Sequence, residues 1–177
     1  MIRVRGATEQ DREAVLDVHR HAFPAGECDA VAKLAVGLLA EETSPATINL
    51  LAEIRGEVVG HIAFSPVTLS GKSDWLGYIL APLGVKPGHQ GGGVGRKLIE
   101  RGMAQVREKP VDVVFVYGDP AYYERYGFGA DAAAGFLPPY RLQYPFGWLA
   151  ISLLDGGLLE ETVRLCVLEP LRDPSLW

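Results

Sequence analysis

The chain has 177 residues, of which 48% are hydrophobic, and a formal net charge of −5. This length suits one domain with a core of its own, and the apolar content excludes a disordered chain. A nucleic-acid partner would favour a basic surface, so the acidic balance argues against one. No apolar run approaches the ~20 residues that a bilayer-spanning helix needs, so no membrane partner is expected.

The N-terminus and the cysteines indicate the compartment. The chain turns polar directly after Met1-Ile2, which is unlike a signal peptide. Cys28 and Cys166 do not make a disulfide framework. We therefore expect a cytoplasmic protein with reduced thiols. The histidines have no metal-ligand spacing with each other or with the cysteines, so no metal is expected.

The first predicted elements are a short strand and two helices. Ile2–Arg5 alternates like a strand. Thr8 can cap a helix with one apolar face, which Pro24-Ala25-Gly26 ends. Apolar residues recur at helical spacing from Asp29 to Glu41, which predicts a second helix.

Strands are predicted next. Ile48–Ile54 and Val58–Phe64 are apolar runs joined at Arg55-Gly56, which is typical of a β-hairpin. Trp75–Val85 reads as the adjacent strand, but glycines and Pro82 interrupt it. Such interruptions indicate a bulge, or a strand that parts from its neighbour.

A glycine cluster separates that strand from a helix predicted to run to Glu108. The sequence from Gln90 to Gly95 is Q-G-G-G-V-G. A helix start carries unpaired N–H groups and the positive end of the helix dipole, and glycines let a phosphate approach them. The spacing fits neither the dinucleotide fingerprint nor the phosphate loop of nucleotide hydrolases. A glycine-rich turn without a ligand is the alternative.

A second motif lies downstream. Val113–Tyr117 is an apolar run typical of a buried strand. Asp119 can cap a short helix, Pro120–Tyr126, which Gly127 would end. A loop-rich stretch from residue 131 to 147 follows. The last expected elements are a strand at Trp148–Leu154, a turn at Asp155-Gly156-Gly157, and a strand or a helix at Thr162–Val167.

These motifs resemble those of one enzyme family. Q-x-x-G-x-G at 90–95 resembles the acetyl-CoA motif of the GCN5-related N-acetyltransferases (GNAT), and Tyr123–Phe128 fits Y-x-x-x-G-F, which resembles the family's catalytic tyrosine motif. The strings Gly118–Tyr123 and Pro139-Tyr140 resemble its YhbS-like branch. The resemblance implies a single α/β domain over residues 1–177. Its mixed, mostly antiparallel twisted sheet would have helices on both faces and a splayed central strand pair.

The resemblance also implies an activity and a cofactor site. We expect an acetyl-CoA-dependent N-acetyltransferase, an acyltransferase that acetylates a primary amine of a small molecule or peptide by direct attack in a ternary complex. Acetyl-CoA would be a cosubstrate. The expected cofactor-binding residues are the splayed edge, Leu83, Gly84 and Val85, and the loop, Gln90, Gly91, Gly92, Gly93, Val94, Gly95 and Arg96.

The catalytic groups are less completely specified. Tyr123 is the candidate general acid for the departing thiolate, because its phenol is protonated at neutral pH; packing is the alternative. Several relatives place a carboxylate between positions 75 and 86, where this chain has none. Glu27 and Asp29 are candidates for binding or deprotonating the amine, with helix capping or solvation as the alternative.

Two rival functions remain open at this point. A catalytically inactive CoA-binding sensor or interaction module would keep the glycine loop and would explain the missing carboxylate. A nucleotide-binding enzyme is disfavoured because both of its motif frames fail. The resemblance leaves the acceptor unidentified and a homodimer open.

Overall fold

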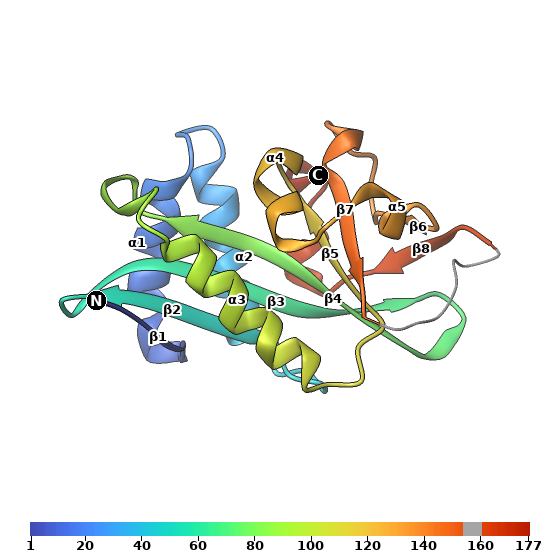
Figure 1. Cartoon of the computed structure of the whole chain (residues 1–177), viewed down its shortest axis with the longest axis horizontal. Helices are drawn as coiled ribbons and strands as arrows, with labels where there is room; N and C mark the ends of the chain where they lie inside the picture. The colour runs from blue at the N-terminus through green and yellow to red at the C-terminus, as the bar shows by residue number, and fades with distance from the viewer. Residues whose placement is uncertain (154–160) are drawn as a thin grey trace. The chain divides into compact units, whose positions relative to one another are not determined.

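The computed structural model describes residues 1–153 and 161–177 (Figure 1). Its strands are β1 Ile2–Gly6, β2 Ile48–Ile54, β3 Glu57–Leu69, β4 Lys72–Val85, β5 Val113–Tyr117, β6 Phe136–Leu137, β7 Trp148–Ser152 and β8 Val163–Cys166. Its helices are α1 Arg12–Ala22, α2 Cys28–Ala40, α3 Val94–Arg107, α4 Pro120–Tyr123 and α5 Ala130–Ala133. Short 3-10 turns include η1 Glu9–Asp11, η2 Pro87–His89 and η3 Glu124–Tyr126.

The strands form a mixed sheet. Its order is β1-β2-β3-β4-β5-β7, and β8 pairs with β3 and β6. The β4–β5 and β6–β8 pairs are parallel. The β1–β2, β2–β3, β3–β8 and β5–β7 pairs are antiparallel. The predicted α/β class with a mostly antiparallel sheet is therefore confirmed.

The chain forms two compact units. The first comprises residues 1–65 and 81–108, and the second comprises residues 66–80 and 109–177. β3 and β4 pass from one unit into the other, so each strand supplies residues to both. The single domain over residues 1–177 stays a prediction.

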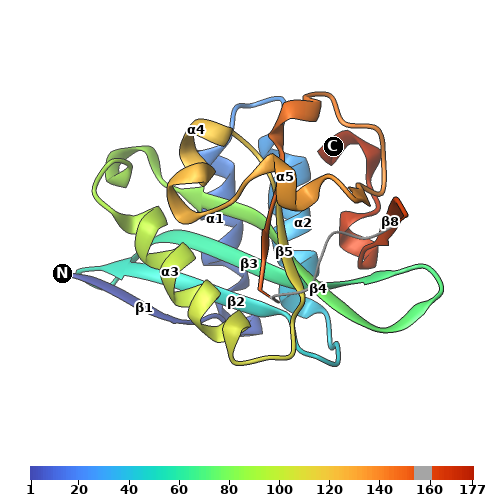
Figure 2. The same cartoon turned by 45° about the vertical axis from the view of Figure 1, so that its right-hand side comes forward.

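In the first unit, helices cover both faces of the strands. Val15 of α1 packs with Ala35 of α2 and Leu51 of β2 in one buried cluster. On the other face, a Cβ at Gly60 of β3 would lie 2.8 Å from Cγ1 of Val94, at the start of α3. Figures 1 and 2 show α3 in front of β1–β3, and α1 and α2 behind these strands. Helices on both faces are thus confirmed within this unit.

Aromatic rings form the centre of the second unit. Phe115 of β5 stacks on Trp148 of β7, with ring centroids 5.2 Å apart, and meets Phe136 edge-on at 5.0 Å. Trp75 of β4 lies 5.5 Å from the Phe136 ring. The indole N–H of Trp148 donates to the carbonyl of Phe136 at 2.9 Å, so this buried donor is satisfied. The cluster fixes β5, which leads directly into α4.

Several predicted elements differ from the observed ones in detail. The helix expected over Pro120–Tyr126 divides into α4 and η3, because helix ends commonly tighten into a 3-10 turn. The stretch from residue 131 to 147, expected to be mostly loop, contains β6 and the end of α5. β8 settles the choice at Thr162–Val167 in favour of a strand. Residues 154–157, at the end of one expected strand and in the following turn, lie outside the described residues.

The predicted parting of two strands concerns the end of β4. The β4–β5 ladder pairs Gly77–Leu80 with Val113–Val116. The ladder stops at Leu80, whereas β4 continues to Val85. The continuation belongs to the first unit and β5 to the second, so the splay stays a prediction.

Candidate functional site

The loop between β4 and α3 carries the glycine motif. Gly91 and Gly93 have φ of 73° and 84°, left-handed values that residues with a Cβ rarely adopt. A Cβ at either position would meet no described atom within 4 Å. Space around these two positions would admit a side chain, so it is the left-handed backbone conformation that favours glycine at both. The result is an exposed loop whose surface is free of side chains at these two positions.

The side chain of Gln90 ties this loop to the strand. Its Nε2 donates to the carbonyl oxygen of Val85 at 2.9 Å, and its backbone N–H donates to the carbonyl of Pro87 at 3.3 Å. These bonds fix the spacing between the end of β4 and the start of α3. The predicted cofactor residues, Leu83–Val85 and Gln90–Arg96, thus lie in one unit and are joined by a hydrogen bond.

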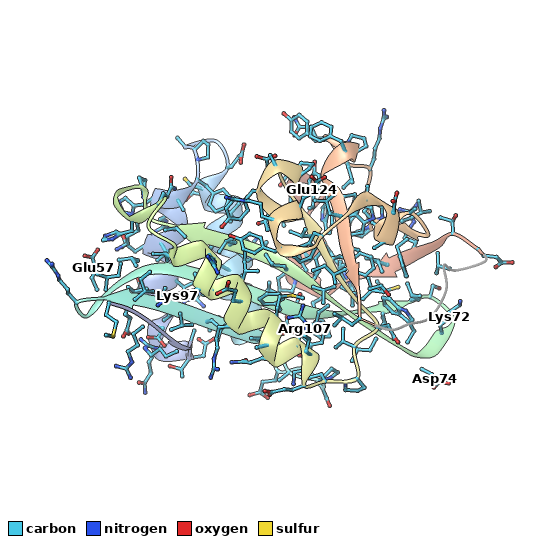
Figure 3. The ribbon with its side chains drawn as sticks, in the orientation of Figure 1. Glu57, Lys72, Asp74, Lys97, Arg107 and Glu124 are labelled. Carbon is cyan, nitrogen blue, oxygen red and sulfur yellow. The ribbon has the colours of Figure 1, made fainter. Side chains whose placement is uncertain are left out.

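The first turn of α3 presents backbone donors and cations. The N–H of Lys97 donates to the carbonyl of Gly93 at 3.1 Å. The N–H groups of Val94 and Gly95 precede that bond and have no intrahelical partner. Arg96 and Lys97 are exposed, and this fully described turn contains no acidic residue. Figure 3 labels Lys97 near the start of this helix. The Nε of Arg96 also donates to Glu100 at 2.7 Å.

A glycine that we did not single out from the sequence holds the start of α3 against β3. A Cβ at Gly60 would lie 2.8 Å from Cγ1 of Val94 and 3.1 Å from Cδ1 of Leu98. The helix can approach the strand this closely because Gly60 has no side chain. The available signal was a glycine within a predicted strand, which marks a close approach.

Gly84 of β4 makes a similar close approach to α1. A Cβ there would lie 2.7 Å from Nδ1 and 2.8 Å from Cε1 of His19. His19 in turn lies beside His61 of β3, with 2.8 Å between Nε2 and Nδ1. The two histidines are 42 positions apart on different elements, so no local pattern in the sequence could reveal this pairing.

Tyr123 lies at the end of α4 in the second unit. Its ring meets Phe128 edge-on, with centroids 5.9 Å apart, and is partly exposed. Gly127 has a φ of 92° and ends η3, as its sequence position predicted. Burial raises the pKa of Tyr123 above the ordinary tyrosine value. The phenol is therefore protonated at neutral pH and can act as a hydrogen-bond donor.

The Tyr123 ring packs against Gly118, in space that a side chain at this position would fill. A Cβ at Gly118 would meet ring carbons Cε2 and Cδ2, the latter at 3.0 Å. We expect Gly118→Ala to displace the ring and to lower the free energy of unfolding by about 1–3 kcal/mol, as overpacking does. Urea unfolding measures the loss. Gly129→Ala is the matched control, since a Cβ there meets no described atom within 4 Å. Equal losses would contradict the role of Gly118.

The neighbouring tyrosines have structural contacts. The rings of Tyr122 and Tyr126 lie side by side, with centroids 5.5 Å apart. The guanidinium of Arg125 lies over the Tyr122 ring at 4.7 Å. The hydroxyl of Tyr117 accepts a hydrogen bond from the backbone N–H of Tyr144 at 2.9 Å. These contacts favour packing roles for the three tyrosines.

Glu27 and Asp29, the candidate acceptor-binding acids, lie at the start of α2 in the first unit. Both are exposed. Glu27 occupies the N-cap position, but within the described chain its side chain makes no capping bond. Asp29 lies in the first turn of α2, with its Oδ1 3.7 Å from the Nε of Arg20. The helix dipole favours an acidic residue in this turn, so the position of Asp29 is explained without a catalytic role.

The described residues also bear on metal and membrane functions. Over residues 1–153 and 161–177, no group of three or more His, Cys, Asp or Glu side chains is arranged to hold a metal ion. Within the same residues, no helix has both the length and the apolar character needed to cross a membrane.

Comparison with known proteins adds a family match. The family model described as the acetyltransferase (GNAT) domain matches residues 3–130. The uncharacterized N-acetyltransferase YjhQ of Escherichia coli strain K12 is 37% identical over 150 residues, which cover 82% of this chain and 81% of the relative. The residues matched by the family model, 3–130, include both the glycine loop and Tyr123.

Two solved structures have a similar fold. The GNAT family N-acetyltransferase YhbS from Escherichia coli, in complex with CoA, has a TM-score of 0.76 and 29% identity, covering 96% of this chain and 90% of that one. A GNAT family acetyltransferase from Brucella melitensis, in complex with acetyl-CoA, has a TM-score of 0.71 and 28% identity, covering 96% and 97%.

Proposed function

Because the chain belongs to the GNAT acetyltransferase family, we propose that it transfers an acetyl group from acetyl-CoA to a primary amine of a small molecule or peptide. The amine attacks the thioester directly while both substrates are bound. The nitrogen–carbon bond forms and the carbon–sulfur bond breaks. The amine loses a proton and the sulfur gains one.

The glycine loop is the observation that carries this function. Gly91 and Gly93 keep Cβ atoms away from a loop that opens onto the N-terminus of α3. The N–H groups of Val94 and Gly95 can donate to a diphosphate there. Two solved structures similar to this chain hold CoA and acetyl-CoA, which supports a CoA thioester as the donor.

The charges in the first turn of α3 support an anionic ligand. The helix dipole disfavours cations at a helix N-terminus by roughly 0.3–1 kcal/mol each. Arg96 and Lys97 nevertheless occupy this turn and are exposed. A bound diphosphate would reverse that penalty, and Arg96 could contact it while retaining Glu100 as a partner.

The end of β4 is proposed to hold the acyl arm. Leu83, Gly84 and Val85 follow the last residue that β4 pairs with β5. Their backbone groups could bind the pantetheine amides and polarise the thioester carbonyl, since a preorganised N–H donor stabilises developing negative charge on oxygen. The bond from Gln90 to Val85 would keep this edge in register with the loop.

Tyr123 is proposed to donate a hydrogen bond to the departing sulfur. Ordinary phenol and thiol pKa values of about 10 and 8.5 make full proton transfer to a thiolate uphill by about 2 kcal/mol. Burial raises the pKa of Tyr123 and adds to that cost. The phenol therefore acts best by stabilising negative charge on sulfur as the bond breaks, with the proton following last.

Glu27 and Asp29 are proposed to attract the amine or to deprotonate it through water. A positioned carboxylate can serve as a general base, and these two are exposed on the first unit. The strand from Trp75 to Val85 offers no carboxylate for this purpose.

One experiment tests the proposed function. The purified chain is incubated with acetyl-labelled acetyl-CoA and a crude metabolite mixture, and mass spectrometry searches for labelled amides. Calorimetry measures CoA affinity in parallel. We expect CoA binding and a labelled amide that depends on the protein. CoA binding without any product would point to the inactive CoA-binding module, which the family assignment does not favour. No CoA binding would overturn the proposal.

A further inference from the structure

A buried pair of histidines lies behind the end of β4. His19 of α1 and His61 of β3 are each 0% exposed. The Nε2 of His19 lies 2.8 Å from the Nδ1 of His61, and the Nε2 of His61 lies 3.3 Å from the Oδ1 of Asn49. The Nδ2 of Asn49 is 3.3 Å from the carbonyl oxygen of Leu38. The four residues form one hydrogen-bonded network within the first unit.

Donor and acceptor chemistry fixes which atom donates in each hydrogen bond of this network. The carbonyl of Leu38 can only accept, so the amide of Asn49 must donate to it and turn its oxygen toward His61. His61 then donates from Nε2 and, as a neutral imidazole, accepts at Nδ1. His19 must donate from Nε2, which leaves its Nδ1 without a proton.

That unprotonated nitrogen faces Gly84. Nδ1 of His19 is buried and has no hydrogen-bond partner among the described residues. A Cβ at Gly84 would lie 2.7 Å from it, so the strand and the imidazole are in close contact. The tautomer that the network imposes leaves a lone pair on this Nδ1. An N–H in its place would point at Gly84, where it would have neither room nor an acceptor.

Both imidazoles are held in the neutral form. Burial lowers the pKa of His19 to about 3. Burial, and then the nearby His19, lower the pKa of His61 well below its ordinary value. At neutral pH the two imidazoles therefore stay uncharged, and the lone pair on Nδ1 of His19 stays on the side of the ring that meets Gly84.

We propose that His19, fixed in its tautomer by His61 and Asn49, is a positioning residue that sets the backbone at Gly84 for acyl transfer. The role rests on the proposed function, because Leu83–Val85 is the edge proposed to hold the thioester. α3 and the glycine loop lie on one side of the strands, and His19 supports the β4 edge from the α1 side. Displacing catalytic geometry by about 1 Å can cost a factor of 10² in rate, so a rigid support at this point matters.

A second contact strengthens the link between α1 and this end of β4. The Nζ of Lys86 lies 2.7 Å from Oδ2 of Asp17, on the same helix as His19. Lys86 also reaches Glu57 at 3.1 Å, and its backbone N–H donates to the carbonyl of Val59 at 2.9 Å. The strand is thus held just beyond Val85 as well as at Gly84.

The tautomer is tested on the unmodified chain. Two-bond nitrogen–proton NMR correlations distinguish a protonated from an unprotonated imidazole nitrogen. We expect His19 to be neutral at pH 7, with a proton on Nε2 and none on Nδ1. A protonated Nδ1, or a cationic His19, would overturn the proposal without any substitution that could disturb folding.

The positioning role is tested by a double-mutant cycle on acetyl-CoA affinity, measured by calorimetry with CoA alone in parallel. Gly84→Ala should weaken acetyl-CoA binding at least tenfold when His19 is present, because the new methyl displaces the imidazole or the strand. In a His19→Ala background the same change should cost less than threefold, because the two closest contacts are gone and only the 3.3 Å approach to Cγ1 of Val18 remains.

Matched substitutions complete the cycle. Gly6→Ala, where a Cβ meets no described atom within 4 Å, and His21→Ala, an exposed histidine on the same helix, should leave affinity within twofold. Equal costs of Gly84→Ala in both backgrounds, or coupling seen in thermal stability but not in affinity, would overturn the positioning role alone. Failure of the unmodified chain to bind CoA would instead remove the proposed function.

Discussion

Replacing Gly93 by glutamate is expected to abolish the binding of CoA and acetyl-CoA, with a loss in affinity of at least about 100-fold. Gly93 has a φ of 84°, and a left-handed backbone costs a residue with a Cβ roughly 1–2 kcal/mol. The glutamate also adds a negative charge where the diphosphate is proposed to bind, directly before α3. Each 1.4 kcal/mol is a factor of ten, so the backbone strain accounts for about one decade and the added negative charge is expected to supply the remainder.

Gly71→Glu is the matched control for that result. Gly71 has a φ of 77°, and a Cβ there meets no described atom within 4 Å, but it precedes β4 whereas the loop follows it. It should show the same backbone strain and leave CoA affinity within about twofold. Gly93→Ala separates strain from charge and should fall between the two. Calorimetry with CoA measures all three, and normal binding by Gly93→Glu would remove the loop from the site.

Tyr123→Phe is expected to lower kcat by a factor of about 10² to 10⁴, the usual range for a lost general acid. Affinity for CoA should stay within about threefold, because the proposed cofactor contacts lie in the other unit. The phenylalanine ring keeps the contacts with Phe128 and Gly118, so stability should change little. Steady-state kinetics with the amine found by the labelling experiment measure the change.

Tyr126→Phe controls for the loss of a hydroxyl in the same segment. Tyr126 lies beside Tyr122, and its change should leave kcat within about threefold. A Tyr123→Phe variant with unchanged kcat would exclude the phenol from the reaction. A variant with lower kcat and a matching loss of stability would assign Tyr123 to packing instead.

Much of the fold followed from local patterns. The strands Ile48–Ile54 and Val113–Tyr117 have the predicted bounds, because predominantly apolar runs bounded by turn residues identify strands. Asp119 caps α4 by accepting from the N–H of Ala121 at 2.9 Å, and Gly127 ends the following turn, as their residue types predicted. Each of these features depends on residues within one or two turns of the chain.

Elements with weak local signals were missed. α5 and β6 are only four and two residues long, too short for a periodic pattern to emerge from a loop-rich stretch. The 3-10 turn over Glu124–Tyr126 has the same composition as a helix end, so the sequence could not separate the two. These shortfalls concern the second unit and leave the glycine loop unaffected.

The sequence by itself determined the glycine loop, the strand before it, the helix after it and the start of α4 at Pro120, because backbone preference and capping act over a few neighbouring residues. Only the tertiary structure decided which glycines must stay small and which histidines meet. Gly60 and Gly84 each face a side chain of a helix that packs against their strand. His19 and His61 meet across 42 positions because a helix face and a strand register coincide. Contacts of that range depend on the packed core, which no local pattern encodes.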